Sequence, residues 1–180
     1  MAARTLPTMP SWSTGQEITS SLLNQITAYS QFWSSPPMFS MYQATVQSVA
    51  TGAYAQITCD TSLWDTDSGR SATTPYSYTI PFAGRWEFSW KIGWAVNATG
   101  GRLSALYQNG TIVTGSQTGL QAITDAGRTT DVASSTKTVL CNVGDVMSIW
   151  AFQDSGGNLS TDTTGGASYF EGRLVSLASP

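Results

Sequence analysis

The side chains best suited to chemistry in this sequence are three aspartates, Asp60, Asp65 and Asp67, in the segment CDTSLWDTDSG. Carboxylate oxygens gathered over a few residues are the ligands that a calcium ion prefers. Their spacing differs from that of an EF-hand loop, and no glutamate follows at the twelfth position. Aspartates are also common in turns, where they accept hydrogen bonds from nearby backbone N–H groups. We therefore expect turn-forming aspartates and no metal ion or other cofactor, with these three as the metal candidates.

Carboxylates would also have to carry any catalysis, because the 180 residues include no histidine. That absence removes the commonest general base, the commonest zinc ligand, and the Ser-His and Cys-His nucleophile pairs. Glycoside hydrolysis needs only two carboxylates, and the candidates for such a pair are Asp60, Asp65, Asp67, Glu87, Asp145 and Asp154. No spacing among them favours one pair. We expect no catalytic residue and no enzyme, and a carboxylate glycosidase is an alternative that the spacing does not support.

Three aromatic residues, Trp64, Tyr76 and Tyr78, could form a flat face on which sugar rings stack. The alternative, which we favour, is that they fill the core or a contact between subunits. The two cysteines, Cys59 and Cys141, are too few for a disulfide framework in a chain of this length. We expect both to be buried free thiols.

Composition narrows the range of partners. Only 11% of the residues are charged and 41% are hydrophobic, so neutral polar residues carry the solubility and suit dense packing against other subunits. The net charge is −3 and the eight basic residues are scattered, so we expect no binding of nucleic acid. No apolar run approaches the roughly 18 residues that span a bilayer, and the first residues lack the apolar segment of a signal peptide. We expect synthesis in the cytoplasm and no membrane insertion.

The clearest signal of secondary structure lies in residues 85–96, RWEFSWKIGWAV. Large apolar residues alternate there with polar or small ones, and this period of two indicates a β-strand with one buried face. A helix would place Phe88 and Ile92 beside Glu87 and Lys91. We expect the following residues to lie in the core or in a contact between subunits: Trp86, Phe88, Trp90, Ile92, Trp94, Trp150 and Phe170.

The first 37 residues follow a different pattern. Residues 1–13 contain two prolines and should be an extended arm. From Thr14 the spacing fits a helix with a capping box, which must end before Pro36 and Pro37. We therefore divide the chain into an N-terminal segment, 1–37, and a head, 38–180. The segment could attach the head to another protein, or its apolar stripe could simply pack on the head; the attachment residues would be Trp12, Ile18, Leu22, Ile26, Tyr29 and Trp33.

After the proline pair the pattern is all-β. We expect strands at 38–47, 54–59, 76–80, 85–96, 102–108, 111–116, 128–141, 145–153 and 168–177. Strands of this number and length form a two-sheet sandwich or a barrel, and a jelly roll is one common solution. The expected fold is a jelly-roll sandwich of about 8–10 antiparallel strands.

Four motifs of the head resemble a known family. They are IPFAGRWEF at 80–88, YQNG at 107–110, LCNVGDV at 140–146 and SYFEGRL at 168–174. In order and spacing they resemble the globular head of the complement first component, whose superfamily includes tumour necrosis factor. The resemblance covers about four fifths of the chain, and it implies a ten-stranded jelly roll that forms compact homotrimers.

The N-terminal segment is similar to something else. WSTGQEITSSLLN at 12–24, followed by the proline pair, resembles the opening of virion structural proteins from tailed phages of actinobacteria. The two resemblances together imply a non-enzymatic phage virion protein, a trimeric capsid decoration or head spike that is made in the host cytoplasm. Its partners would be a major capsid protein or tail proteins. The alternative is a minor tail or tail-tip adhesion protein that binds a host surface glycan.

Overall fold

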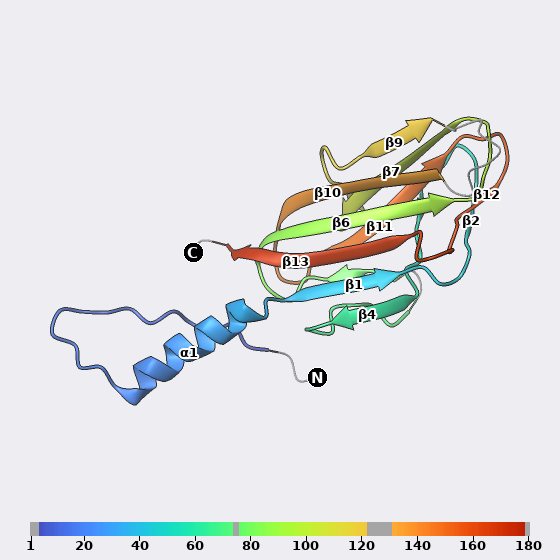
Figure 1. Ribbon diagram of the computed structural model, residues 1–180. Coiled ribbons are helices and arrows are strands. Elements are labelled where there is room, and N and C mark those ends of the chain that lie inside the picture. Colours follow the sequence, from blue (N-terminus) through green and yellow to red (C-terminus); the bar gives the residue numbers. More distant parts are fainter. Residues whose placement is uncertain (1–3, 74–75, 122–130, 179–180) are drawn as a thin grey trace.

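The expected all-β jelly roll is confirmed. A computed structural model describes residues 4–73, 76–121 and 131–178, and side chains from residue 134 onward in the last range. Within that part the chain forms one helix and thirteen strands, and the strand pairs are antiparallel. Two sheets pack face to face, and the helix lies beyond one end of the sandwich (Figure 1).

The first sheet has five strands in the order β10-β6-β13-β1-β4. Because chain neighbours are rarely sheet neighbours here, residues far apart in the sequence meet on its faces. The long central strand β6 pairs with β10 on one side and β13 on the other. The strands are β1 (Met38–Tyr42), β4 (Thr61–Asp65), β6 (Gly84–Trp94), β10 (Asp131–Cys141) and β13 (Tyr169–Leu177).

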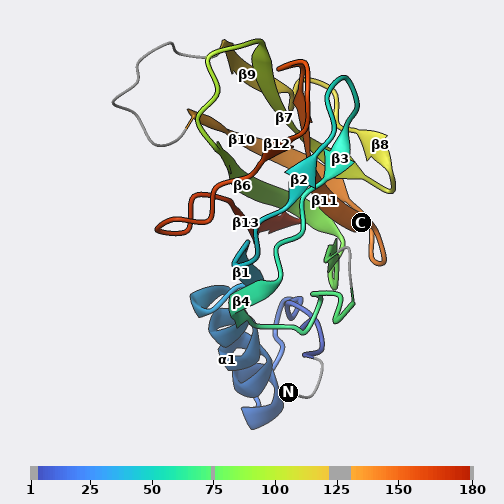
Figure 2. The ribbon, with the colours of Figure 1, turned by 90° about the vertical axis from the view of Figure 1, so that its right-hand side faces the viewer.

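The second sheet follows the order β3-β11-β7-β8, with β5 also paired to β11 and β9 to β7. The strands β2 and β12 form a separate pair that covers one side of the sandwich (Figure 2). The bounds are β2 (Ser48–Val49), β3 (Ala55–Gln56), β5 (Tyr78–Thr79), β7 (Gly101–Gln108), β8 (Thr111–Ile112), β9 (Thr118–Gln121), β11 (Val146–Gln153) and β12 (Leu159–Ser160).

The alternating side chains of β6 form the centre of the core. Trp86, Phe88, Trp90, Ile92 and Trp94 are each 0% exposed, and Phe170 from β13 is also buried. Two indole nitrogens find partners inside the core: Trp86 Nε1 donates to the Phe82 carbonyl and Trp90 Nε1 donates to Ser104 Oγ, both at 3.0 Å. One chain buries these six side chains by itself, so they belong to the core and not to a contact between subunits.

Trp150 lies outside the core, the first of the two places expected for it. In β11 the side chains of Met147, Ile149 and Ala151 fill the core, and Trp150 points away from it on the outer face of the second sheet. There its ring stacks on Tyr107 with a centroid separation of 4.7 Å, and its indole N–H donates to Ser148 Oγ. The sequence pattern could not separate the two faces, because this strand is apolar on both of them.

Several expected strands are shorter than their sequence patterns. The expected strand 38–47 is shorter, since β1 ends at Tyr42. The strand expected at 128–141 is described from Asp131, because residues 128–130 lie outside the described part. The segment that we expected to be an aspartate loop contains β4. The strand β9 and the pair β2–β12 were not expected at all.

The helix α1 (Ser20–Ser34) begins one turn later than expected. The residue that caps it is Thr19, whose side chain accepts a hydrogen bond from the backbone N–H of Leu22. The expected cap at Thr14 fails because Gly15 has a φ of +78°, which interrupts helical geometry. Within the described residues, no helix has the length and apolar content that crossing a lipid bilayer requires.

Candidate functional site

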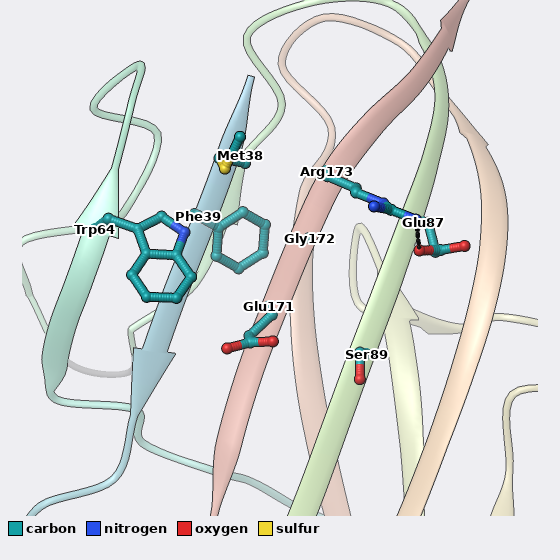
Figure 3. A pocket seen from close by; sticks show the side chains of 8 residues that line it. All are labelled: Met38, Phe39, Trp64, Glu87, Ser89, Glu171, Gly172 and Arg173. Carbon is teal, nitrogen blue, oxygen red and sulfur yellow. Dashed lines mark ion pairs between the residues drawn. The ribbon is translucent and has the colours of Figure 1, made fainter. Parts of the chain in front are cut away.

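A pocket of about 320 Å³ opens on the outer face of the five-stranded sheet. Figure 3 shows its lining, which comes from four adjacent strands, β4, β1, β13 and β6. We call it the Trp64 pocket. Its lining residues are Met38, Phe39, Trp64, Glu87, Ser89, Glu171, Gly172 and Arg173.

Strand alternation decides which side chains reach this face. Because Phe88, Phe170 and Leu174 point into the core, the residues directly before and after each of them point outward. Strand pairing then sets them side by side: Glu171 lies opposite Ser89, and Arg173 lies opposite Glu87.

Gly172, also in the lining, lies close to two rings of the core. A Cβ atom there would lie 2.5 Å from the ring of Phe39 and 2.8 Å from that of Phe88. A larger residue at this position would therefore disturb the floor of the pocket.

The charges of the Trp64 pocket are two carboxylates and one guanidinium. Arg173 forms an ion pair with Glu87 at 2.8 Å, and both side chains are reached by solvent. The Glu171 carboxylate accepts a hydrogen bond of 2.6 Å from the Ser40 hydroxyl, which holds it in a fixed orientation. The pocket therefore offers the Glu171 carboxylate as an oriented acceptor, beside the Arg173–Glu87 pair, which has a donor and an acceptor.

The aromatic wall of the pocket is Trp64 of β4, which lies opposite Ser40 of β1 and is 48% exposed. The other two aromatics of the expected flat face lie elsewhere. Tyr78 is buried and stacks on Phe39 with ring centroids 3.7 Å apart, so it fills the core as we favoured. Tyr76 packs against the guanidinium of Arg70. Only Trp64 is left as a surface on which a ligand could stack.

The three aspartates of the expected turn are separated and held by protein donors. Asp60 accepts from the backbone N–H groups of Ala44 and Thr45 at 2.7 and 3.0 Å. Burial opposes its ionisation, but the hydrogen bonds outweigh burial, and the pKa of Asp60 lies below its ordinary value. Asp65 accepts from three backbone N–H groups, those of residues 67, 69 and 70. Within the described residues, no group of three or more acidic or cysteine side chains is placed to hold a metal ion.

Asp145 and Asp154, two further candidate carboxylates, do not line the pocket. Asp145 accepts from the Gln108 and Asn109 amides and from the Asn142 backbone, and Asp154 accepts from the backbone of Gly101. Of the six carboxylates proposed for a catalytic pair, only Glu87 lines the pocket.

Glu171 lines the pocket together with Glu87, but it was not among the candidate carboxylates of the sequence analysis. The alternation of β13 could have placed this side chain on the outer face, but only the strand pairing shows that it lies opposite Ser89, beside the pair of Arg173 and Glu87.

Both cysteines are buried and free. Burial raises the pKa of the Cys59 thiol to about 12, and it raises the pKa of the Cys141 thiol to about 12 as well. Neither thiol is near the Trp64 pocket lining, so both are structural.

The N-terminal segment is fastened to the head by Arg4. Its Nε and Nη2 atoms donate to the two carboxylate oxygens of Asp67 at 2.8 and 2.6 Å. The same guanidinium donates to Thr66 Oγ1 and to the Ser35 carbonyl, and it lies over the ring of Phe32. Since the Asp67 side chain is 1% exposed, this is a bidentate pair with a buried carboxylate. The third metal candidate is therefore used to hold the arm in place.

We call residues 4–35 the N-terminal lobe. Residues 4–19 run beside α1, and the whole lobe projects from the end of the sandwich where β1 begins (Figure 1). Phe32 is the one residue of α1 that is buried, and its ring meets that of Phe82 at 5.4 Å. The rest of the lobe leaves six large apolar side chains exposed: Leu6, Met9, Trp12, Ile18, Leu23 and Ile26.

The structure divides the expected attachment residues into two groups. Trp12, Ile18 and Ile26 are exposed, and Ile18 reaches 66%. Leu22, Tyr29 and Trp33 are partly buried within the lobe or against the head, and Tyr29 contacts Trp33 edge to face. The exposed group is available to a partner, and the sequence pattern alone had missed Leu6, Met9 and Leu23.

Known structures share this fold. An Eiger TNF from S. frugiperda matches with a TM-score of 0.61 and 12% identity, over 81% of this chain and 96% of that one. The globular domain of a zebrafish complement 1qA protein matches with a TM-score of 0.54 and 14% identity, over 79% and 99%. Murine APRIL at pH 5.0 gives a TM-score of 0.56 and 10% identity, over 77% and 99%. No protein-family model matches the sequence, and no curated protein matches it. The chain therefore has a jelly-roll fold of the TNF and complement 1q type.

Proposed function

We propose that this chain is a non-enzymatic structural protein of a phage virion, a homotrimeric jelly-roll head that is attached to the particle through its N-terminal lobe. The observation that carries the proposal is the exposed apolar surface of that lobe, which projects from a head whose own core is complete. Six large apolar side chains exposed on one lobe supply apolar area that a partner protein could cover. The likeness of residues 12–24 to phage virion proteins supports the virion as that partner.

The oligomeric part of the proposal is supported by strand β10. This strand has eleven residues and lies at the end of its sheet, where its outer side has no strand partner in the described part of the chain. A long open edge invites pairing with other chains unless something covers it. Leu140 on this strand is 60% exposed, which suits coverage by a neighbouring subunit. A closed ring of three would cover the edge of every subunit.

A trimer would also strengthen attachment. Each lobe offers a modest apolar contact, but three lobes on one head bind the particle together. Linked sites of this kind raise the apparent affinity by roughly 10²–10⁴. Firm attachment therefore needs no single large interface.

The non-enzymatic part of the proposal is supported by the placement of the acidic residues. Five of the six candidate carboxylates are held by hydrogen-bond donors away from the Trp64 pocket, and Glu87 is paired with Arg173. A general acid or base must lie within hydrogen-bond reach of the substrate, and carboxylates held outside the pocket lining do not meet this requirement for a substrate in the pocket.

Two measurements on the full-length protein test the proposal. Light scattering should give three times the chain mass of 19.2 kDa at micromolar concentration. Sedimentation with particles that lack the protein should then show binding that falls when Trp12, Ile18 and Ile26 are all changed to serine. The matched control changes three exposed valines of the head, Val46, Val96 and Val143, to serine and should bind like the wild type. A monomer mass, or equal binding by the two triple variants, would contradict the proposal.

A second candidate is a tail-tip adhesion protein, which shares the fold and differs in position on the particle. The observation that favours it is the half-exposed Trp64 at the wall of a polar pocket. Location on the particle separates the two candidates.

A further inference from the structure

We propose that Asn109 is a site of spontaneous covalent modification, and that the Asp145 carboxylate controls the rate of the reaction. The reaction is deamidation, the loss of ammonia from an asparagine that precedes a glycine. It takes place within one chain and needs only water, so it requires neither a ligand nor a free surface for a partner. The inference goes beyond the proposed function and is tested without particles.

The reacting residues form the turn between β7 and β8 (Figure 2). Both have positive φ, +52° for Asn109 and +77° for Gly110, as the tight turn of a hairpin requires. This is the one place in the sequence where an asparagine precedes a glycine. Both residues are exposed, and a Cβ atom on Gly110 would meet no atom within 4 Å. The Gly110 nitrogen therefore has no side chain beside it to hinder a reaction, and water is at hand.

The chemistry begins at the backbone nitrogen of Gly110. This nitrogen loses its proton to solvent and attacks Cγ of Asn109, and the new N–Cγ bond closes a five-membered imide. The side-chain nitrogen takes up a proton and leaves as ammonia. Water then opens the ring at one of its two carbonyl carbons. Opening at Cγ leaves an aspartate at position 109, and opening at the backbone carbon leaves an isoaspartate, through whose side chain the main chain then runs.

The structure holds the reacting amide at both of its ends. Asn109 Nδ2 donates to Asp145 Oδ1 at 2.8 Å, and Asn109 Oδ1 accepts from the Val146 backbone N–H at 2.8 Å. Both partners lie at the start of β11 and not in the turn. Ring closure brings Cγ within bonding distance of the Gly110 nitrogen and expels Nδ2, so the bond to Asp145 must break. Hydrogen bonds to a carboxylate are stronger than neutral ones, and this bond should therefore slow the reaction most.

Asp145 is itself fixed in place by other donors. Its Oδ2 atom accepts from the Gln108 amide and from the Asn142 backbone N–H, both at 2.7 Å. Burial opposes the ionisation of Asp145, but the hydrogen bonds, that from Asn109 first among them, outweigh burial and lower its pKa. The carboxylate is therefore charged and oriented at neutral pH. Asp145 acts as a positioning residue, because it holds the amide of Asn109 and takes no part in the bond changes.

Modification would turn this contact from attraction to repulsion. A carboxylate at position 109 has no N–H to donate and places a second negative charge beside Asp145. Asp145 also joins the turn between β7 and β8 to the turn between β10 and β11, through Gln108 and Asn142. Modified chains should therefore melt at a lower temperature than intact ones.

The test follows deamidation of the full-length protein at mildly alkaline pH, in buffer and in concentrated urea. The readout is the mass of the proteolytic peptide that contains Asn109, which rises when NH₂ is replaced by OH. The native protein should react at least about tenfold more slowly than the unfolded one. The change Asp145→Ala should raise the native rate by about tenfold or more. Asp145→Asn, whose amide oxygen can still accept a hydrogen bond, should give an intermediate rate.

The matched control is Gln108→Ala. It removes a different hydrogen bond of Asp145, leaves both bonds of Asn109 in place, and should react like the wild type. In urea all four proteins should react at one rate, because these contacts are absent there. Circular dichroism and light scattering of each variant establish that it is folded and has the wild-type mass. If the Asp145→Ala protein does not fold, Asp145→Asn carries the comparison.

Three results would overturn the inference. The first is a native wild-type protein that reacts as fast as the unfolded one, which would show that the contacts of Asn109 give no protection. The second is a folded Asp145 variant that reacts at the wild-type rate or more slowly. The third is an equal acceleration by Gln108→Ala, which would show that general loosening of the turn, and not the bond to Asn109, sets the rate.

Discussion

Replacing Arg4 with methionine should destabilise the protein although Arg4 lies near the end of the chain. The change keeps most of the apolar stem and removes the guanidinium. Asp67, whose side chain is 1% exposed, then loses both of its hydrogen bonds from Arg4 and keeps one from the Thr66 hydroxyl. The lobe also loses its contact at the Ser35 carbonyl.

The size of the effect follows from burial on the two sides of the pair. Removing one partner of a fully buried ion pair costs about 3–5 kcal/mol, because a charge is left without a partner. Here the Arg4 side chain is 29% exposed, so water can replace part of what is lost. We therefore expect a loss of about 2–3 kcal/mol in the free energy of unfolding. The hydrogen bond to Asp67 also raises the pKa of Arg4 above its ordinary value, which agrees in sign with a stabilising pair.

The assay is urea denaturation, and the molecule contains its own control. The ion pair between Arg173 and Glu87 has nearly the same length, but its side chains are 63% and 36% exposed. Exposed pairs contribute about 0–1 kcal/mol, so Arg173→Gln should have a much smaller effect than Arg4→Met. Hydrogen exchange of α1 should increase in Arg4→Met alone, because that residue fastens the lobe.

A double variant tests the mechanism. If Arg4 acts through Asp67, then Arg4→Met combined with Asp67→Asn should cost clearly less than the sum of the two single changes. Equal losses for Arg4→Met and Arg173→Gln, or additive effects in the double variant, would refute the reasoning.

Three further results are expected. Trp90→Ala should lower the free energy of unfolding by about 3–5 kcal/mol through the cavity that it leaves, and an unchanged melting temperature would place Trp90 outside the core. The melting temperature should be nearly constant from about pH 5.5 to 8, where no histidine titrates, and should fall below about pH 4. Burial opposes the ionisation of Asp60 and Asp145, but their hydrogen bonds outweigh burial and lower the pKa of each. Their contribution to the free energy of unfolding is therefore complete above the ordinary pKa of 3.8 and is lost as the pH falls through the folded pKa. A constant melting temperature down to about pH 2 would contradict this. A thiol reagent at about pH 8 should label Cys59 and Cys141 only after unfolding, because burial keeps both protonated, and rapid labelling of the native protein would contradict the buried positions.

Local periodicity was enough to predict the core strand and the fold class. In β6 only one face is apolar, so the pattern fixed which side chains enter the core. In β11 both faces are apolar, and the pattern could not tell that Ile149 is buried and that Trp150 lies on the outer face. A similar limit applied to the helix, whose cap was expected at Thr14 and lies at Thr19. The positive φ of Gly15, which the sequence does not show, decided for Thr19.

The Trp64 pocket could not be predicted because it depends on long-range pairing. Its side chains come from four strands that are far apart in the sequence and adjacent only in the sheet. The strand that carries Trp64 is surrounded by aspartates and small polar residues, which are typical of turns. The sequence pattern also could not show that Arg4 reaches Asp67, more than sixty positions away. A turn-forming aspartate was expected there, with calcium as the weaker candidate, and neither expectation included the ion pair with Arg4.

The most direct test of the proposed role is to locate the protein on virions. Antibodies raised against the head should label intact particles in electron micrographs, in a repeated pattern over the capsid. Labelling of the tail tip alone would favour the adhesion candidate. The contradicting result is that particles purified from cells that make the protein carry no label and do not contain the chain. Such a result would rule out a virion role.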